Sequence, residues 1–537
     1  MSAPHNENYV YLFDTTLRDG AQTRGVDFSI KDKKTIAKYL DAIGVDYIEG
    51  GWPGANPTDD AFFAAPPALT SRFTAFGMTR RHGRSAANDP GLQAVLNSAD
   101  HVCLVGKNSS RHVSEVLSLT LEQNLTSISE SISEGVRKGK EVLYDAEHFF
   151  DGYKSDPVYA IDCLRAAQEA EASWLVLCDT NGGTLPHEVF EIVSAVTKAL
   201  PDARFGIHTH NDCGCAVANS LEAVRAGCRM IQGTLNGLGE RCGNADITVL
   251  IPLLDKMGYT TGVSTEQKCQ LTKISRALDD LLDRAPNEAQ PFVGRRAFAH
   301  KGGLHVSAVA KNAELYEHTL PESVGNQREI IMSDQAGKSN GLLLLREMGL
   351  DIDANDPRLA TIIERIKERE AEGYSYSNAP ESFSLLAKHV LEPSARSAFE
   401  IVKFHISNSV SFSGGKEISQ STAEVIVRID SILSSQTATG NGPVNALDLC
   451  LRKALHVFFP VVECVRLSDY HVRILDTKSA TAAVTRVSIE MQDAQSGKTW
   501  RTVGVSPNIV TASIEALRDG YEYYLCGLEV VENKAVI

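Results

Sequence analysis

From Tyr9 to about Met257 the chain repeats one pattern of apolar and polar positions. A short apolar run is followed by a turn rich in Gly, Asn or Asp, and then by a stretch with apolar residues at helical spacing. The apolar runs are Val10–Phe13, Val45–Ile48, Phe73–Met78, His101–Val105, Glu141–Tyr144, Trp174–Cys178, Arg204–Ile207 and Arg229–Leu235. Continuously apolar runs are typical of strands buried on both faces. Each repeat therefore predicts one β-strand followed by one α-helix.

The number of repeats favours one architecture. Eight such units over roughly 250 residues match the size of a closed (β/α)8 barrel, the TIM barrel. A doubly wound open sheet has the same alternation, but no glycine-rich dinucleotide-binding sequence follows the first apolar run. We therefore expect a barrel within residues 1–270.

The chain, at 537 residues, is too long for a single hydrophobic core. Helical, charge-rich patterns at Thr265–Arg284 and Asp356–Glu372 flank an irregular segment, Phe298–Tyr316. We interpret residues 271–395 as helical linker subdomains.

The pattern changes again in residues 396–537. Strand-like runs at Glu424–Ile429 and Val484–Met491 are followed by helical patterns that begin near Pro443 and Pro507. We expect a separate C-terminal α+β domain that contains a weak internal duplication.

Polar residues that could perform chemistry follow several of the predicted strands. In a barrel of parallel strands the active site lies at the C-terminal strand ends, so these residues should share one site. They are Asp14–Gln22 after the first run, Glu147 after the fifth, Asp179 and Thr180 after the sixth, His208–Asp212 after the seventh and Asn236–Asn244 after the eighth.

The clearest candidate for a metal site is the pair His208 and His210. Residues two apart on a strand point to the same face, so both imidazoles can reach one ion. Two imidazoles with an amide oxygen and a carboxylate, which Asp19 could supply, suit a divalent cation that keeps positions open for a keto acid. An isolated HxH sequence is more often a hydrogen-bonded polar pair. The predicted position of His208 and His210 at a barrel mouth favours a metal site over a hydrogen-bonded pair.

The cysteines offer a second possibility for metal binding. Cys213 and Cys215 lie past the strand end, where helix packing is the simpler interpretation, and a structural zinc site with four cysteine ligands needs a second closely spaced pair. The 11 cysteines are scattered and odd in number, with Cys103 and Cys178 inside apolar runs. This usage is typical of reduced thiols in a reducing compartment.

The charged candidates each allow two interpretations. Arg18 beside Asp19 could be a surface ion pair of little energetic consequence, or it could hold enolate or alkoxide charge. Glu147 could be a solvated carboxylate or could orient a water or the substrate. Glu240 and Arg241 could form a simple turn, or their glycine-rich loop could approach a thioester or a pyrophosphate. For Arg18 the barrel mouth favours the catalytic role.

The overall charge excludes some partners. A net charge of −15 argues against nucleic acid, which usually binds a concentrated basic surface. No apolar run approaches the roughly 18 residues of a membrane span, and Met1–Tyr9 lacks the features of a signal peptide. We expect a cytoplasmic protein that binds neither nucleic acid nor membrane.

Three sequence strings together resemble one known family. DTTLRDGAQ (14–22), HTHND (208–212) and NGLGERCGN (236–244) are similar to the family of 2-isopropylmalate synthase, homocitrate synthase, citramalate synthase and hydroxymethylglutaryl-CoA lyase. Phe298–Val309 resembles the subdomain that follows the barrel in this family, and Gly442–Ala446 and Trp500–Ser506 resemble its regulatory domain. The resemblance implies a metal-dependent acyltransferase that converts the acyl group into an alkyl group, with Mg or Mn favoured and Zn or Co possible.

The resemblance also implies roles for individual residues. Arg18 would lie next to the keto-acid carbonyl and Thr180 would hold its carboxylate, while His305 would take part in acid–base catalysis. Asn312 and Tyr316 match residues that reach the site from the partner chain. The implied metal ligands are Asp19, His208, His210 and Asn244; the catalytic residues Arg18, Glu147, His305 and Tyr316; the substrate-binding residues Arg18, Gln22, Thr180 and Asn312; and the acetyl-CoA-binding residues Asn236, Gly239, Glu240 and Arg241.

The substrates are implied by further similarity within the family. Tyr47–Pro57, Tyr144–Lys154 and Leu177–Pro186 are most similar to the branch that condenses acetyl-CoA with pyruvate, in the pyruvate route to isoleucine. The alternative is the branch that uses 2-ketoisovalerate, in leucine biosynthesis; a lyase and a non-catalytic binding protein are more distant possibilities. Tyr144–His148 departs from the family pattern Phe-Ser-x-Glu-Asp, so the pocket for the keto-acid side chain is not carried over.

The regulatory-type domain implies further partners. By resemblance the protein is a homodimer whose linker subdomain reaches the partner's active site, and isoleucine is a possible feedback inhibitor. Leucine is the alternative ligand. A dimerisation domain without regulation is the other interpretation, because similarity of fold alone is a weak guide to function.

Overall fold

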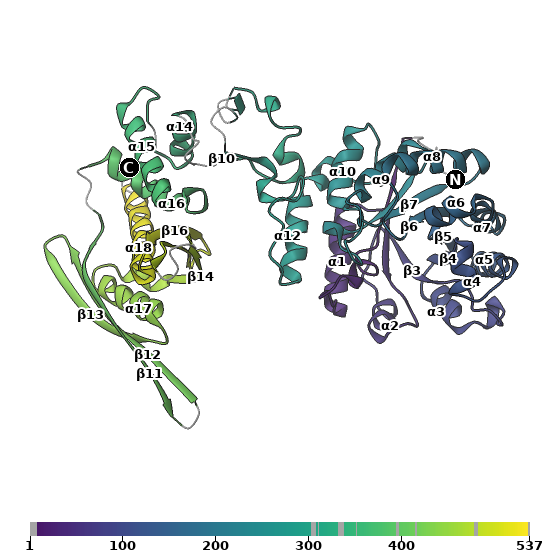
Figure 1. The fold of residues 1–537 in the computed structure, drawn as a ribbon, viewed down its shortest axis with the longest axis horizontal. Helices are drawn as coiled ribbons and strands as arrows, with labels where there is room; N and C mark the ends of the chain where they lie inside the picture. The colour runs from purple at the N-terminus through teal and green to yellow at the C-terminus, as the bar shows by residue number, and fades with distance from the viewer. Residues whose placement is uncertain are drawn as a thin grey trace. The chain divides into compact units, whose positions relative to one another are not determined.

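The structure, a computed structural model, describes residues 8–301, 305, 308–309, 311–330, 338–350, 352–393, 397–413, 416–476 and 482–534. The segment Phe298–Tyr316 therefore lies partly outside the described residues. The chain forms two compact units, Met1–Phe298 with Thr319–Gln327 and Ala299–His318 with Arg328–Ile537 (Figure 1).

The first unit is a closed barrel of parallel strands in the order β1 to β8, with helices around them (Figure 1). Pairing of β1 with β8, from Tyr11–Met230 to Asp14–Gly233, closes the barrel. The strands are β1 (Tyr11–Asp14), β2 (Tyr47–Gly51), β3 (Arg72–Met78), β4 (His101–Lys107), β5 (Glu141–Glu147), β6 (Trp174–Asp179), β7 (Phe205–Thr209) and β8 (Met230–Gly233). Each of the predicted apolar runs overlaps one strand, so the predicted (β/α)8 barrel is confirmed.

Many helices of this unit begin at positions that the sequence marks clearly. Pro57, Pro90, Pro157 and Pro186 each occupy the first helical turn, where a fixed φ and a missing N–H are tolerated. The helices are α1 (Ile30–Ile43), α2 (Pro57–Ala64), α3 (Pro90–Ser98), α4 (Ser110–Glu115), α5 (Leu121–Arg137), α6 (Phe149–Ser155), α7 (Pro157–Glu169), α8 (Pro186–Ala199), α9 (Ala216–Arg225), α10 (Ile247–Lys256), α11 (Thr265–Lys268) and α12 (Leu271–Leu281).

Apolar side chains fill the lower part of the barrel interior. Alternate residues of a strand point to opposite faces, so Leu143 of β5 faces inward with Phe13 and Trp174, while Tyr144 packs among the helices. The Arg204 guanidinium lies 3.8 Å from the centre of the Trp174 ring. The interior is thus packed toward the N-terminal strand ends, and the polar interior positions lie toward the C-terminal ends.

A buried ion pair holds the loop between β2 and α2 at the rim of the barrel mouth. Lys33 and Asp59 are 4% and 6% exposed, and the Lys33 ammonium donates to Asp59 and to the Gly50 carbonyl. The other Asp59 oxygen accepts from the Trp52 backbone N–H at 2.8 Å and from Asn56 Nδ2 at 2.9 Å. One carboxylate therefore fixes the loop to α1.

The second unit begins with short elements and ends in two similar modules. It contains β9 (Ala299–His300), β10 (Glu329–Ile330), α14 (Lys338–Glu347), α15 (Pro357–Glu372) and α16 (Pro380–Leu391). The first module is β11 (Glu400–Ser413), β12 (Lys416–Ile429), β13 (Ile432–Gly440) and α17 (Pro443–His456). The second is β14 (Val465–Ile474), β15 (Thr485–Asp493), β16 (Thr499–Ser506) and α18 (Ile509–Lys534).

Each module is a three-stranded antiparallel sheet followed by a helix, which confirms the expected α+β architecture with its duplication. The sequence pattern identified only the central strands β12 and β15. Their alternate residues, such as Val425 and Ile489, are buried, whereas most of β13 and β14 is solvent-exposed. A strand without a buried row of apolar side chains has no clear sequence pattern.

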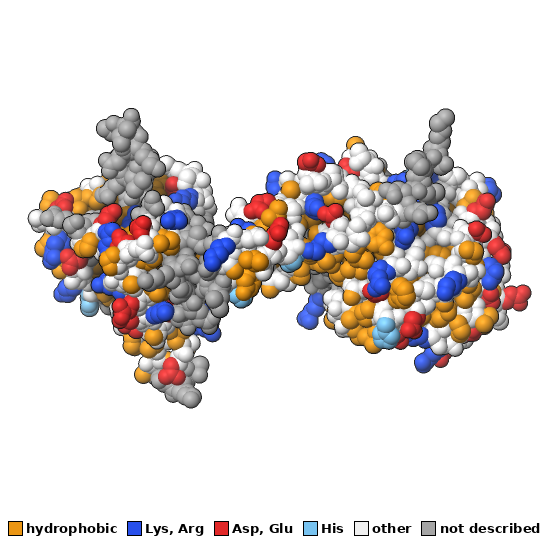
Figure 2. All heavy atoms as spheres, turned by 90° about the horizontal axis from the view of Figure 1, so that it is seen from above, with side chains coloured by type: hydrophobic (Ala, Val, Ile, Leu, Met, Phe, Trp, Pro, Cys, Tyr) orange, Lys and Arg blue, Asp and Glu red, His pale blue; other side chains and the backbone are white. Residues whose placement is uncertain are grey.

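The described surface carries mixed charge. On the face seen in Figure 2, Lys and Arg side chains are interspersed with Asp, Glu and apolar side chains. Among the helices of the described residues, none combines the length and apolarity needed to cross a membrane.

Replacing Lys33 by Met should destabilise the barrel by about 3–5 kcal/mol, because it leaves the buried Asp59 carboxylate without its cation. Urea unfolding monitored by tryptophan fluorescence measures this effect, since Trp52 and Trp174 lie in the barrel. The double variant Lys33→Met/Asp59→Leu should regain part of the loss. Lys38→Met, at an exposed position of the same helix, is the control. An equal effect of the two single variants would contradict the role of the buried pair.

Candidate active site and metal centre

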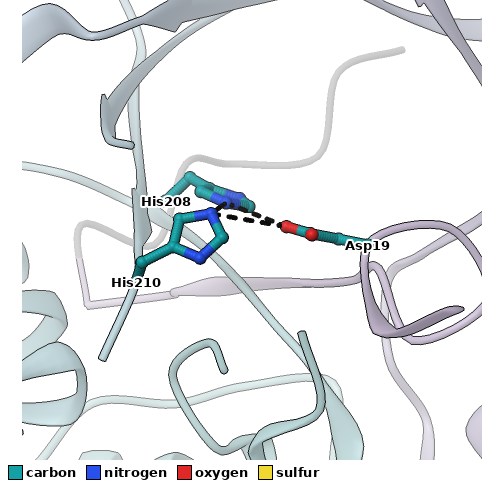
Figure 3. A group of neighbouring side chains, drawn as sticks. All are labelled: Asp19, His208 and His210. Carbon is teal, nitrogen blue, oxygen red and sulfur yellow. Dashed lines mark hydrogen bonds and ion pairs between the residues drawn. The ribbon is translucent and has the colours of Figure 1, made fainter. Parts of the chain in front are cut away.

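The side chains of Asp19, His208 and His210 converge at the mouth of the barrel (Figure 3). His208 lies on β7 and His210 follows its end, while Asp19 follows β1. Asp19 Oδ2 lies 3.3 Å from His208 Nε2 and 3.7 Å from His210 Nε2, and the two Nε2 atoms are 3.3 Å apart. All three side chains are buried. Among the described residues, this is the group of His, Cys, Asp and Glu side chains arranged to hold a metal ion.

Asn244 completes the set predicted from the sequence. It forms an isolated antiparallel bridge with His210, which brings the loop after β8 against the end of β7. Its Nδ2 donates to Asp19 Oδ2 at 2.8 Å, and its buried Oδ1 has no hydrogen-bond partner. A Cβ added at Gly239 would lie 2.2 Å from that Oδ1. Glycine in this loop therefore leaves room for the Asn244 side chain.

These atoms fit a divalent cation. Two imidazole nitrogens and one carboxylate oxygen face the same point, and the buried Asn244 Oδ1 is an oxygen ligand without a hydrogen-bond partner. Two imidazoles, one carboxylate and one amide oxygen are a donor set that several divalent ions accept. The structure therefore brings together all four predicted ligands.

The charges at this site shift several pKa values. Burial alone would raise the pKa of Asp19, but the Arg18 charge and the His208 hydrogen bond hold it well below its usual range. Burial opposes the charged form of His208, yet the hydrogen bond and charge of Asp19 outweigh it and raise the pKa of His208. Burial and the neighbouring His208 lower the pKa of His210 to about 4. The two histidines therefore differ in protonation when no metal is bound.

Arg18 is held inside the barrel mouth rather than on the surface. Its Nε donates to Glu49 Oε2 at 2.7 Å, and its guanidinium carbon lies 4.0 Å from the centre of the Phe76 ring. Its Nη1 lies 3.9 Å from Asp19 Oδ2. Arg18 is thus fixed beside the candidate metal ligands. The interpretation as an ordinary surface pair does not fit this burial.

Glu49 is a site residue that the sequence analysis missed. It is fully buried on β2, and its Oε2 also accepts from Thr15 Oγ1 at 2.5 Å. Burial raises the pKa of Glu49, although the Arg18 charge opposes the shift. The sequence feature that could have identified Glu49 is a carboxylate near the end of the otherwise uncharged strand Tyr47–Gly51.

Glu147 and Thr180 lie on neighbouring strand ends. Glu147 Oε2 is 2.5 Å from Lys107 Nζ at the end of β4, and Thr180 Oγ1 accepts from the His148 backbone N–H at 2.8 Å. The sequence analysis also missed Lys107. The apolar run His101–Val105 ends before Lys107, whereas strand β4 continues to that residue. Glu147 is therefore an ion-paired carboxylate at the mouth rather than a freely solvated one.

The residues predicted to bind acetyl-CoA have well-defined partners in the structure. Asn236 Nδ2 donates to the Ser275 carbonyl at 3.0 Å, and Arg241 Nε donates to Asp212 Oδ1 at 2.8 Å. Gly239 N–H donates to Thr23 Oγ1 at 2.8 Å, and Glu240 is exposed. Their contact with acetyl-CoA stays a prediction.

Gln22 lines a cavity of about 400 Å³ beside Arg18 and Trp52. Gln22 ends the short 3-10 helix Gly20–Gln22, which directly follows Asp19. A substrate role for Gln22 stays a prediction.

Cys213 and Cys215 do not join the metal cluster. Cys215 lies directly before α9, and its thiol donates to the Cys213 carbonyl at 3.4 Å.

The residues predicted from the linker belong to the second unit. The rings of His305 and Tyr316 stack with centres 4.3 Å apart. Asn312 Oδ1 accepts from the Glu314 backbone N–H at 3.0 Å. The buried Glu317 pairs with the buried His300 and with the partly exposed Arg328, an arrangement that the sequence analysis did not identify. That His305, Asn312 and Tyr316 reach an active site stays a prediction.

A family model described as HMGL-like matches residues 9–277, which span the barrel and its mouth. The chain belongs to the HMGL-like family. A homocitrate synthase post-HMGL domain-like model matches residues 292–373, and a LeuA allosteric (dimerisation) domain model matches residues 378–525. The predicted family is confirmed.

Several relatives that are similar over nearly the whole chain are (R)-citramalate synthases. The (R)-citramalate synthase of Aquifex aeolicus is 45% identical, covering 96% of this chain and 98% of the relative. The (R)-citramalate synthase of Geobacter sulfurreducens is 45% identical, covering 98% of this chain and 99% of the relative. A probable 2-isopropylmalate synthase of Methanopyrus kandleri is 31% identical, covering 95% of this chain and 97% of the relative. The predicted likeness to the pyruvate-using branch is thus confirmed.

Among solved structures, the HMG-CoA lyase of Bacillus subtilis is similar with a TM-score of 0.45 and 20% identity. The similarity covers 53% of this chain and 97% of the lyase.

Metal binding should release one proton at a pH above the pKa of His210 and below the raised pKa of His208, although two histidines bind the ion. His208 has a raised pKa and must lose its proton, whereas His210, with a pKa of about 4, is already neutral. Below the raised pKa of His208, the apparent affinity should fall by about tenfold per pH unit. Calorimetric titration with Co²⁺ in buffers of different ionisation enthalpy counts the protons. Release of two protons, or of none, would contradict this assignment.

Proposed function

We propose that the protein is an (R)-citramalate synthase, which condenses acetyl-CoA with pyruvate and water to give (R)-citramalate and CoA. The observation that carries the proposal is the 45% identity to proteins of that name over nearly the full chain. The buried Asp19, His208 and His210 beside Arg18 supply a site with suitable chemistry. We place the enzyme in the cytoplasm, on the pyruvate route to isoleucine.

The residues around Asp19 would hold the divalent cation, with Mg or Mn favoured over Zn or Co. When bound, the cation supplies Lewis acidity toward the carboxylate and carbonyl oxygens of the keto acid. Asp19, His208, His210 and Asn244 are its proposed ligands. Their burial keeps bulk water from competing for the site, which strengthens each electrostatic interaction there.

Arg18 stabilises the negative charge that develops on the keto oxygen. Glu49, Thr15 and Phe76 fix its position before the substrate arrives, so little reorganisation accompanies the reaction. Thr180 donates a hydrogen bond to the pyruvate carboxylate. Glu147, held by Lys107, orients the substrate or a water molecule at the opposite side of the mouth.

His305 acts as the base in the condensation. It removes a proton from the methyl group of acetyl-CoA, and the resulting enolate carbon forms a bond to the keto carbon of pyruvate. Tyr316, which stacks on His305, restricts the orientation of the imidazole. Water then hydrolyses the thioester, which releases CoA and draws the condensation forward.

We further propose that three segments of the chain have different functions. Residues 1–270 catalyse the reaction, residues 271–395 complete the active site of a partner subunit, and residues 396–537 form the dimer and regulate it. The match to an allosteric dimerisation domain supports a homodimer. Isoleucine is the proposed inhibitor and leucine the alternative, and each would act by binding a less active state preferentially.

The competing function is 2-isopropylmalate synthase, which joins acetyl-CoA to the larger 2-ketoisovalerate. It rests on the more distant 31% identity to a protein of that probable name. Each extra carbon in a pocket changes substrate preference by only a limited factor. Direct comparison of substrates is therefore needed.

Thiol release from acetyl-CoA should be fastest with pyruvate when the purified protein is supplied with Mn²⁺. Assays in parallel with 2-ketoisovalerate, 2-ketobutyrate and 2-ketoglutarate measure the preference, and each is repeated with isoleucine or leucine. Excess chelator should abolish the activity, and added Mn²⁺ should restore it. Preference for 2-ketoisovalerate would move the assignment to the competing function, and no release with any keto acid would refute both.

Replacing His305 by Asn should lower the turnover number by at least about 100-fold while changing the Michaelis constant for pyruvate little, because a base acts only in the transition state. Steady-state kinetics measure both constants. His471→Asn is the matched control, since the His471 side chain is 79% exposed in the same unit. A normal turnover number in the His305 variant would remove this residue from the mechanism.

A further inference from the structure

A buried amide links one candidate metal ligand to a carboxylate on a strand that is not its neighbour in the barrel. Gln232 lies on β8 and is fully buried. Its Oε1 lies 2.8 Å from His208 Nδ1, and its Nε2 donates to Asp145 Oδ1 at 2.8 Å. Asp145 lies on β5, which is not adjacent to β8 in the sheet. The connection therefore crosses the barrel interior beneath the metal site.

The orientation of the Gln232 amide follows from the chemistry of its two neighbours. A carboxylate only accepts hydrogen bonds, so the NH2 group must face Asp145 and the oxygen must face His208. The Cys103 thiol, whose pKa burial raises well above its usual value, is also hydrogen-bonded to Asp145. Burial raises the pKa of Asp145, and the charges of His208 and Arg18 oppose this shift. The acceptor role of Asp145 Oδ1 follows from its 2.8 Å distance to Gln232 Nε2.

The orientation of the amide dictates which imidazole nitrogen carries the proton. Since Gln232 Oε1 can only accept, His208 Nδ1 must be the donor, and Nε2 is left with its lone pair when the imidazole is neutral. This Nε2 is the atom that faces Asp19 and His210 (Figure 3). We propose that Asp145 and Gln232 are positioning residues, which fix His208 in the tautomer and ring orientation that binds a divalent cation.

The carboxylate at position 145 gives the arrangement its direction. A hydroxyl group in its place, such as the serine of the pattern Phe-Ser-x-Glu-Asp, could donate as well as accept. Only the carboxylate forces the amide into one orientation. A partner that sets the tautomer of a ligand histidine commonly contributes 10-fold to 100-fold in metal affinity. The inference rests on the metal site of the proposed function.

Three nearly isosteric variants test the inference in the full-length protein with Co²⁺ as the probe. Gln232→Glu places two carboxylates against each other, and Asp145→Asn allows the amide to turn round. Each should weaken Co²⁺ binding by about 10-fold or more. The double variant Asp145→Asn/Gln232→Glu restores one donor and one acceptor, because the amide introduced on β5 donates to the carboxylate introduced on β8, and that carboxylate accepts from His208. Its affinity should return to within about threefold of the original.

A spectroscopic readout reports the tautomer directly. In the Co²⁺-loaded protein, the Nδ1 proton of His208 should give a downfield-shifted exchangeable proton resonance that exchanges slowly with D2O. Gln232→Leu removes its acceptor, so the exchange should become faster. The double variant should keep the slow exchange of the original protein.

The control is Asp448→Asn, which alters a buried carboxylate of the second unit that binds Tyr521 and Arg452. It should lower thermal stability and leave Co²⁺ affinity unchanged. If the affinity losses of Asp145→Asn and Gln232→Glu simply add in the double variant, or if neither single variant loses affinity, the positioning role is refuted. If the original protein binds no Co²⁺, both the inference and the metal site fail, independently of the keto acid used.

Discussion

The carboxylate of Asp19 contacts most of the other candidate active-site side chains. A single buried carboxylate lies next to Arg18, both histidine side chains and the amide of Asn244. Burial makes an isolated charge costly, so it must be offset by cations or hydrogen-bond donors close by. Arg18 supplies one positive charge, and Glu49 cancels it. Asp19 favours the protonated form of His208, and a bound divalent cation would supply positive charge in its place.

The barrel provides this arrangement through the spacing of its strands. Inward positions are apolar in the lower layers, where Phe13 and Trp174 pack, and polar at the C-terminal ends. The packed lower part gives the polar layer a rigid base, which matters because a catalytic group that is misplaced by about 1 Å loses much of its effect. Arg18 illustrates this support, since Phe76 lies beneath it and Glu49 beside it.

The second unit is stabilised by a different kind of packing from that of the barrel. Its two modules bury one face of each antiparallel sheet under a long helix, with Val425 and Ile489 in the shared core. Strands such as β13 and β14 keep much of their length in solvent. A domain of this kind presents edges and exposed apolar side chains that a second copy can cover, which agrees with its match to a dimerisation domain.

The local sequence by itself determined the barrel and the most specific part of its site. Eight apolar runs separated by amphipathic segments fix the (β/α)8 alternation, and the spacing of His208 and His210 places two imidazoles on one face of a strand. These properties depend on neighbours in sequence, so they can be predicted without tertiary contacts. The central strands β12 and β15 were predictable for the same reason.

The tertiary structure decided which other polar residues belong to the site. Glu49, Lys107, Asp145 and Gln232 lie within or beside apolar runs, and a strand buried on both faces does not reveal which of its residues point into the barrel. The closed sheet assigns these directions, because it places β5 across the interior from β8 and β2 next to β1. The hydrogen bonds of Arg18 and His208 therefore exist only in the folded barrel, where residues far apart in sequence share one buried space.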